Sequence, residues 1–148
     1  MPVCMDYTYW ETARVATLRG VDILLGFSAE AKANEFYLAM RGIATRIQES
    51  SAYGTSAFCI TRLFGLNFCG PSAIVAPIGV GGESTFLARA QTHDHEEVIA
   101  AAFDLARLRE FRAQHPRDFN RALYEKYLPS AYTAYRARVT QDGKRKVG

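Results

Sequence analysis

Three side chains near the start of the sequence have the types and spacing that thiol chemistry needs: Cys4, Asp6 and Glu11. Cys4 follows an apolar residue and precedes a segment of helical character, so we expect it at a corner between a strand and a helix. A thiol attacks carbon as its thiolate, which the N-terminus of a helix favours. The backbone amide of Met5 would then donate to an oxyanion formed at a carbonyl. Taken alone, the pattern also fits a small buried cysteine without reactivity.

The other polar candidates have structural interpretations as well. Asp6 can hydrogen-bond its own turn, and Glu11 can cap a helix. Arg46 and Glu49 can form an ion pair on one turn of a helix. The segment His93–His95 is typical of a polar loop, and without a cysteine or a third histidine in register it predicts no metal site.

Hydrophobic periodicity and turn residues indicate the elements that would position these side chains. Ile43 and Ile47 continue an apolar stripe along a long helix, and Gly20 stands where a left-handed cap would end a shorter one. The order of elements predicts a mixed α/β layered domain. The predicted helices cover Thr8–Leu18, with a capping box of Thr8 and Glu11, then about Glu30 to Ser50, and a segment capped by Asp104 that runs through Arg112. The predicted strands cover Val21–Phe27, Thr55–Leu63, Ser72–Pro77, Thr85–Ala90 and Glu97–Asp104, with a glycine-rich turn over residues 78–83.

The composition fits one globular domain, expected over residues 1–139, with a flexible basic tail over residues 140–148. Of the 148 residues, 49% are hydrophobic and 22% charged, which excludes a disordered chain. A formal net charge of +3 is too small to indicate nucleic acid, and no apolar run reaches the roughly 18 residues of a membrane span. The N-terminus lacks the pattern of a signal peptide. Three cysteines (Cys4, Cys59 and Cys69) without that signal predict reduced thiols and a cytoplasmic protein.

The stretch CMDYTYWETARVATLRGVDILL resembles the nucleophile segment of the carbon–nitrogen hydrolase, or nitrilase, superfamily. Three later stretches resemble further segments of that family, namely TRIQESSAY, CGPSAIVAPIG and EEVIAAAFDLARLREFR. All four occur in the family's order from residue 1 to about residue 115. The matching positions are Cys4, Asp6, Tyr9, Glu11, Arg14, Gly20, Asp22, Arg46, Glu49, Gly70, Ser72, Pro77 and Gly79.

The resemblance implies a fold and a reaction. The family fold is a four-layer α-β-β-α sandwich, and its members hydrolyse non-peptide carbon–nitrogen bonds of small amide, carbamoyl or nitrile compounds through a cysteine thioester. By resemblance Cys4 is the nucleophile and the Met5 amide an oxyanion donor, without a metal or organic cofactor. Asp6 and Glu11 would then support the nucleophile, as would two later residues, Arg46 and Glu49.

The family's general-base glutamate and its lysine precede the cysteine, and three residues before Cys4 leave no place for them. The resemblance therefore implies the carboxy-terminal half of such an enzyme, inactive by itself, which pairs with a missing amino-terminal half or forms a homo-oligomer. The alternative is a non-catalytic pseudo-enzyme that keeps the fold and works by association. A tyrosine-rich segment with Leu123, Tyr127, Tyr132 and Tyr135 is a candidate interface. A thiol-redox domain is disfavoured because no CxxC pair is present.

Overall fold

The computed structural model describes residues 3–31, 42–82, 84–115, 126, 127 and 129. The chain divides into two compact units, Met1–His115 and Pro116–Gly148. In the second unit, Lys126 Nζ lies 5.1 Å from the centroid of the Tyr127 ring. Most of the tyrosine-rich segment, and the domain boundary predicted between residues 139 and 140, lie outside the described residues and stay predictions.

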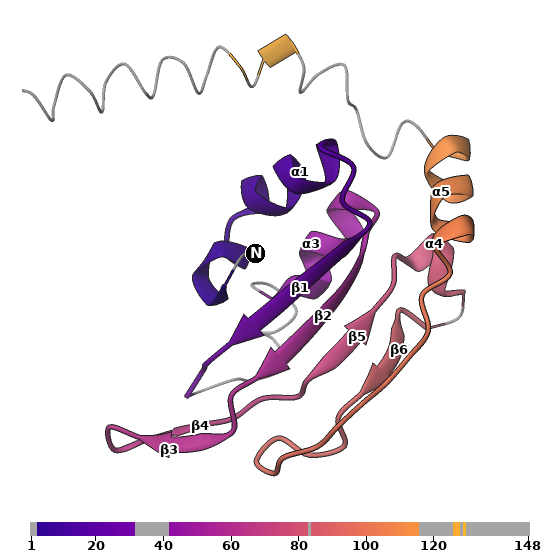
Figure 1. Cartoon of the computed structure of the whole chain (residues 1–148). Helices are drawn as coiled ribbons and strands as arrows, with labels where there is room; N and C mark the ends of the chain where they lie inside the picture. Colours follow the sequence, from indigo (N-terminus) through magenta and orange to yellow (C-terminus); the bar gives the residue numbers. More distant parts are fainter. Residues whose placement is uncertain (1–2, 32–41, 83, 116–125, 128, 130–148) are drawn as a thin grey trace, which may run out of the picture. The chain divides into compact units, whose positions relative to one another are not determined.

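A four-stranded sheet forms the centre of the first unit (Figure 1). Its strand order is β1-β2-β5-β6, with β1 and β2 parallel and the other two pairs antiparallel. Side chains alternate between the faces of a strand, so Leu24 faces the core while Leu25 and Phe27 point the other way. The strands are β1 (Ile23–Ser28), β2 (Tyr53–Phe58), β5 (Ala73–Val75) and β6 (Phe86–Arg89).

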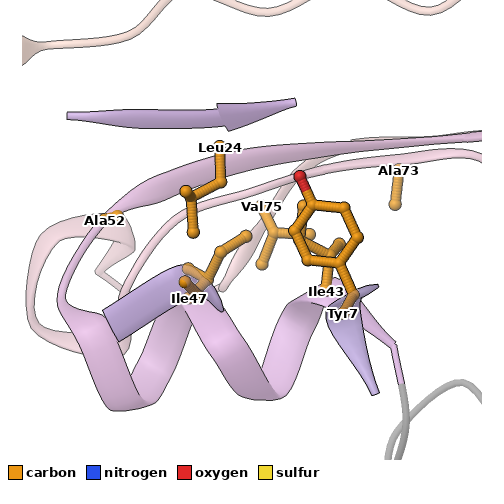
Figure 2. Packing of buried hydrophobic residues seen from close by; sticks show 8 residues of the cluster. Tyr7, Leu24, Ile43, Ile47, Ala52, Ala73 and Val75 are labelled. Atoms are coloured by element: carbon orange, nitrogen blue, oxygen red, sulfur yellow. The ribbon is translucent and has the colours of Figure 1, made fainter. Parts of the chain in front are cut away.

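The first helices of the chain pack on one face of this sheet. The 3-10 turn η1 (Cys4–Tyr7) leads into α1 (Trp10–Leu18), and α3 (Ile43–Ser50) packs beside α1. Their buried residues meet the strands in one hydrophobic cluster (Figure 2). The cluster comprises Tyr7, Ala13, Leu24, Ile43, Ile47, Ala52, Ala73 and Val75.

A second buried cluster joins the sheet to the last two helices. It is built on Tyr53, Ala76, Val80 and Leu108, which come from β2, the end of β5, α4 (Ile78–Gly81) and α5 (Leu105–Gln114). The Tyr53 hydroxyl donates to the Asp104 carbonyl oxygen at 3.1 Å. Among the described residues, none of the helices has the length and apolar character that a membrane crossing would require.

The predicted helix over Thr8–Leu18 exists, but it begins at Trp10 and its predicted capping box is wrong. Tyr9 occupies the N-cap position without a side-chain hydrogen bond. Thr8 Oγ1 instead lies 3.8 Å from Met5 Sδ. The residues before Thr8 already form the separate turn η1. Thr8 therefore lies at the junction between two helical segments and does not cap α1.

The predicted helix from Glu30 to Ser50 is confirmed only over Ile43–Ser50. Glu30 is not helical, and residues 32–41 lie outside the described part of the chain. The predicted turn at residues 78–83 contains the short helix α4. Gly20 has a φ of +91° after α1, as its predicted capping role requires.

Two strand predictions were wrong. The segment Thr55–Leu63 divides into β2 and β3 (Thr61–Leu63), and β3 forms a hairpin with β4 (Leu66–Phe68). The segment Glu97–Asp104 does not form a strand, because no strand among the described residues pairs with it. By contrast, the predicted strands Val21–Phe27, Ser72–Pro77 and Thr85–Ala90 correspond to β1, β5 and β6 within a few residues.

Candidate functional site

Cys4 lies at a sharp corner of the backbone. Val3 before it is extended, with φ −131° and ψ 132°, and Cys4 itself has φ +48°. A positive φ is unusual for a residue with a side chain and is commonly found where function requires it. The nucleophile elbow of hydrolases has this form, since a strained turn presents the nucleophile at its apex. The corner expected at Cys4 is present, but in the described residues it joins an extended residue to a 3-10 turn and not a strand to a helix. The role of Cys4 stays a prediction.

Asp6 and the backbone of η1 hold this corner. Asp6 Oδ2 accepts a hydrogen bond from the Val3 amide at 2.8 Å, and the Asp6 amide donates to the Val3 carbonyl oxygen at 3.0 Å. The Met5 amide precedes the first hydrogen bond of the turn, so it has no partner within the turn. The structural interpretation of Asp6 therefore applies, because this carboxylate fixes the turn that contains Cys4.

Tyr7 anchors the turn to the sheet. Its hydroxyl donates to the carbonyl oxygen of Leu25 on β1. Burial, aided by the nearby Asp6 charge, raises the pKa of Tyr7 to about 12, so the side chain remains a neutral donor across physiological pH. Gly26 makes room for this ring, because a Cβ at Gly26 would lie 3.2 Å from Tyr7 Cε2 and 2.9 Å from the Thr55 carbonyl oxygen.

A cavity of about 30 Å³ lies beneath the turn, which is room for about one water molecule. Cys4 lines it together with the end of β1, the start of α3 and the end of β2. Cys4 Sγ lies 4.0 Å from the Ala29 carbonyl oxygen. Among the described residues that line the cavity, Glu30 is the residue with a carboxylate. Sequence reasoning missed Glu30, because only the return of β1 beneath the turn brings it near a cysteine 26 positions earlier.

Met5 also lines this cavity, whereas the other predicted site residues do not. Glu11 is half-buried in the first turn of α1, and among the described residues its Oε2 has no hydrogen-bond partner. Arg46 is buried, and its Nη1 lies 3.1 Å from Glu49 Oε2 in an ion pair along α3. Asp6 thus holds the turn that contains Cys4, and for Arg46 and Glu49 the structure supports the structural interpretation.

The remaining thiols lie in connections between strands, where Cys59 is exposed and Cys69 is half-buried. The Cys59 amide donates to the Ser28 carbonyl oxygen at 2.8 Å, and the Cys69 amide donates to the Glu30 carbonyl oxygen at 3.0 Å. Both cysteines are free thiols near the end of β1. His95 Nδ1 lies 2.7 Å from Asp94 Oδ1 on an exposed loop. Within the described ranges, no three His, Cys, Asp or Glu side chains gather as a metal site would require.

Comparisons with known proteins give similar solved structures. No family model and no curated protein matches the chain. One similar structure is an amidase from Nesterenkonia sp. AN1, a glutamate-to-glutamine mutant with the acetamide moiety of fluoroacetamide covalently added at the active-site cysteine. It has a TM-score of 0.55 and 23% identity, over 79% of this chain and 42% of that one.

Two further structures of the same Nesterenkonia amidase agree with this result. The amidase after removal of its His-tag gives a TM-score of 0.55 and 24% identity, over 78% of this chain and 43% of that one. A mutant described as an amidase from the nitrilase superfamily gives a TM-score of 0.53 and 23% identity, over 78% of this chain and 42% of that one. The chain spans about two fifths of the length of the solved structures it matches. The first unit therefore has an α/β fold like that of nitrilase-superfamily amidases.

Proposed function

We propose that this chain carries the nucleophile part of a carbon–nitrogen hydrolase and that Cys4 is its nucleophile. The observation that carries the proposal is the position of Cys4 at a left-handed turn above a small cavity. The fold supports it, because the similar amidases have an active-site cysteine that forms covalent adducts. The substrate class is a small amide, carbamoyl or nitrile compound.

The proposed reaction on an amide has two steps. The Cys4 thiol passes its proton to a general base, and sulfur bonds to the carbonyl carbon while the Met5 amide donates to the developing oxyanion. The carbon–nitrogen bond then breaks, the nitrogen takes the proton, and ammonia leaves a thioester on Cys4. Water adds to the thioester and breaks the carbon–sulfur bond, which releases the carboxylic acid and restores the thiol.

The catalytic groups beyond Cys4 are expected to come from outside the chain. The described residues that line the cavity include one carboxylate residue, Glu30, and no lysine. A developing negative charge in such a site needs a positively charged or hydrogen-bonding group to stabilise it. We therefore infer that another polypeptide segment completes the site and that the chain alone does not turn over.

Selective labelling by fluoroacetamide tests the proposal. Cys4 is half-buried while Cys59 is exposed, so accessibility alone would favour Cys59. A nucleophilic cysteine attacks as its thiolate, so the proposal predicts that Cys4 is alkylated at least roughly tenfold faster than Cys59. Peptide mass spectrometry over time measures both rates in one sample, and Cys59→Ala is the matched control for Cys4→Ala. Faster labelling of Cys59 than of Cys4 would refute the proposal.

Ammonia release tests the need for a completing segment. We expect the purified chain to release no more ammonia from acetamide than its Cys4→Ala variant does. Addition of an amino-terminal half from a similar amidase, joined or supplied separately, is expected to raise release through Cys4. Robust turnover by the chain alone that disappears in Cys4→Ala would show that the completing segment is unnecessary.

The second candidate function is a non-catalytic association module, which one observation favours. Leu25 and Phe27 on β1 are 46% and 45% exposed on the sheet face away from α1 and α3. Adjacent exposed apolar side chains of this kind are typical of protein interfaces. This function predicts a stable complex with a Cys4 that reacts no faster than Cys59, so the labelling experiment also separates the two candidates.

A further inference from the structure

The segment between β6 and α5 has a backbone without partners in the described part of the chain. Residues 98–103 follow the loop after β6 and run to the N-cap of α5 without a turn or a bend (Figure 1). Among the described residues, none of their amides or carbonyl oxygens forms a backbone hydrogen bond. An extended backbone with free donors and acceptors is the feature through which one chain recruits a strand of another.

Contacts at both ends fix this segment in place. At its start, Glu97 Oε2 accepts a hydrogen bond from the Gln91 amide at 2.8 Å. At its end, the Tyr53 hydroxyl donates to the Asp104 carbonyl oxygen at 3.1 Å, and the centroids of the Tyr53 and Phe103 rings lie 4.8 Å apart. Because the segment is already ordered, pairing with another strand would cost it little further conformational entropy.

The side chains of the segment alternate between exposed and half-buried, as in a strand with one covered face. Val98 is 97% exposed, whereas Phe103 packs against the buried cluster built on Tyr53. The exposed residues are Val98, Ala100 and Ala102, and the half-buried residues are Ile99, Ala101 and Phe103. The segment therefore has the side-chain pattern of a strand but lacks the second strand that would complete it.

The order of the side chains suits pairing with a second copy of the same segment. A two-fold axis keeps each residue on its own face, so in a symmetric antiparallel pair an exposed residue opposes an exposed one. A pair centred on Ala101 meets this condition, since Ala100 of one copy then opposes Ala102 of the other. In the same register Ile99 opposes Phe103, which is the type of β-branched and aromatic pair that stabilises antiparallel strands.

The carboxylates at the two ends of the segment favour this register over its neighbours. A pair centred on Ala100 would place Glu96 opposite Asp104 of the second copy, and like charges directly opposite destabilise a pair of strands. With the centre on Ala101, Asp104 opposes Val98 and Glu96 lies beyond the paired residues. Centres nearer the C-terminus leave fewer residues to pair, because α5 follows directly.

We propose that residues 98–103 pair with the same residues of a second copy, antiparallel and centred on Ala101, so that the chain forms a two-fold homodimer through this segment. The proposal goes beyond the assignment of Cys4, because no residue of the segment lines the cavity at that thiol. The paired segment is short and the interface small, so we expect a reversible dimer that depends on protein concentration.

Charges placed at two exposed alanines test the pairing and its register. Sedimentation velocity in a reducing buffer, over a concentration series into the millimolar range, gives the dissociation constant of the dimer. In Ala100→Lys/Ala102→Lys each introduced lysine opposes a lysine, whereas in Ala100→Lys/Ala102→Glu each lysine opposes a glutamate. We expect the first variant to dimerise roughly tenfold more weakly than the second. Both positions are exposed, so circular dichroism is expected to show that both variants fold.

Phe27→Lys is the control on a different exposed apolar surface. Phe27 is 45% exposed on β1 and lies outside the paired segment, so we expect its replacement to leave the dissociation constant unchanged. A wild-type chain that stays monomeric in the millimolar range would overturn the proposal and leave the segment to a strand of another polypeptide. Equal dissociation constants for the two double variants, or loss of the dimer only in Phe27→Lys, would overturn it as well.

Amide hydrogen exchange followed by NMR gives an independent measurement. In an antiparallel pair only every second residue of a strand directs its amide to the partner strand. At a concentration where the wild-type chain is dimeric, we expect slowed exchange at alternate residues of 98–103, and no slowing at the same concentration in Ala100→Lys/Ala102→Lys. A wild-type dimer without this alternating protection would overturn the proposal.

Discussion

Replacement of Ile47 by alanine is expected to lower the free energy of unfolding by about 3 to 4 kcal/mol. Ile47 on α3 is fully buried between the helix and the sheet (Figure 2). Gly54 on β2 faces this side chain, and a Cβ at Gly54 would overlap it. Strand and helix already lie as close as Ile47 permits, and the remaining core side chains hold them apart after truncation. A cavity is therefore expected to remain and to add to the cost of the lost contacts.

Urea denaturation followed by circular dichroism measures this effect. Ile78→Ala is the matched control, because Ile78 is 64% exposed and its truncation is expected to change stability by less than about 0.5 kcal/mol. Ile47→Val, with an expected loss of about 1 kcal/mol, keeps the series measurable if the alanine variant unfolds. Equal losses at positions 47 and 78 would contradict the position assigned to Ile47.

Replacement of Asp22 by asparagine is expected to cost about 2 to 3 kcal/mol at neutral pH. Asp22 precedes β1, and its carboxylate accepts from Arg112 at 2.6 Å and from Arg109 at 2.8 Å. Arg112 also donates to the Ser51 carbonyl oxygen at 2.7 Å and to the Val21 carbonyl oxygen at 3.1 Å. The substitution leaves this largely buried arginine without its charge partner. We expect a cost below that of a fully buried pair, because Arg109 is mostly exposed.

The cost of Asp22→Asn is expected to depend on pH. Burial alone would raise the pKa of Asp22, but the hydrogen bonds and charges of Arg109 and Arg112 outweigh it and lower the pKa below its ordinary value of 3.8. A lowered pKa in the folded state gives stability that is present above about pH 4 and lost as pH falls through the lowered value. The difference between wild type and Asp22→Asn is therefore expected to shrink below about pH 4.

Denaturation curves between pH 7 and pH 2.5 check this dependence. Asp94→Asn is the control, because Asp94 is exposed and pairs with His95 on a loop, and we expect it to change stability by less than about 1 kcal/mol. A pH-independent difference for Asp22→Asn would argue that the loss comes from packing and not from the carboxylate charge.

Much of the first unit could be predicted because the sequence patterns that indicate its helices, strands and caps are local. Asp104 caps α5 by accepting from the Arg107 amide at 2.9 Å, as its position before a helical segment indicated. The β3–β4 hairpin was missed although Gly65 marked it, because Phe64 also adopts a positive φ of +54°. An aromatic residue gives no sequence signal for that conformation.

The surroundings of Cys4 could be predicted only in part. Asp6 is two residues from Cys4, so its place in the same turn followed from the spacing. Glu30 and Phe58 reach the cavity because β1 and β2 pair in parallel and end at the same edge of the sheet. Parallel pairing requires a long crossover connection. Neither composition nor periodicity specifies that the ends of the two paired strands will lie against the turn η1, which is formed earlier in the chain.

The ion pairs of Asp22 also bear on the timing of folding during protein synthesis. Arg112 follows Asp22 by 90 positions, and a ribosome adds about 5 to 20 residues per second. Arg112 is therefore synthesised on the order of 5 to 18 seconds after Asp22. During that interval β1 can associate with α1 and α3, but the ion pair between Asp22 and Arg112 that joins α5 to β1 cannot form. Chaperones and proteases therefore encounter an incompletely folded first unit.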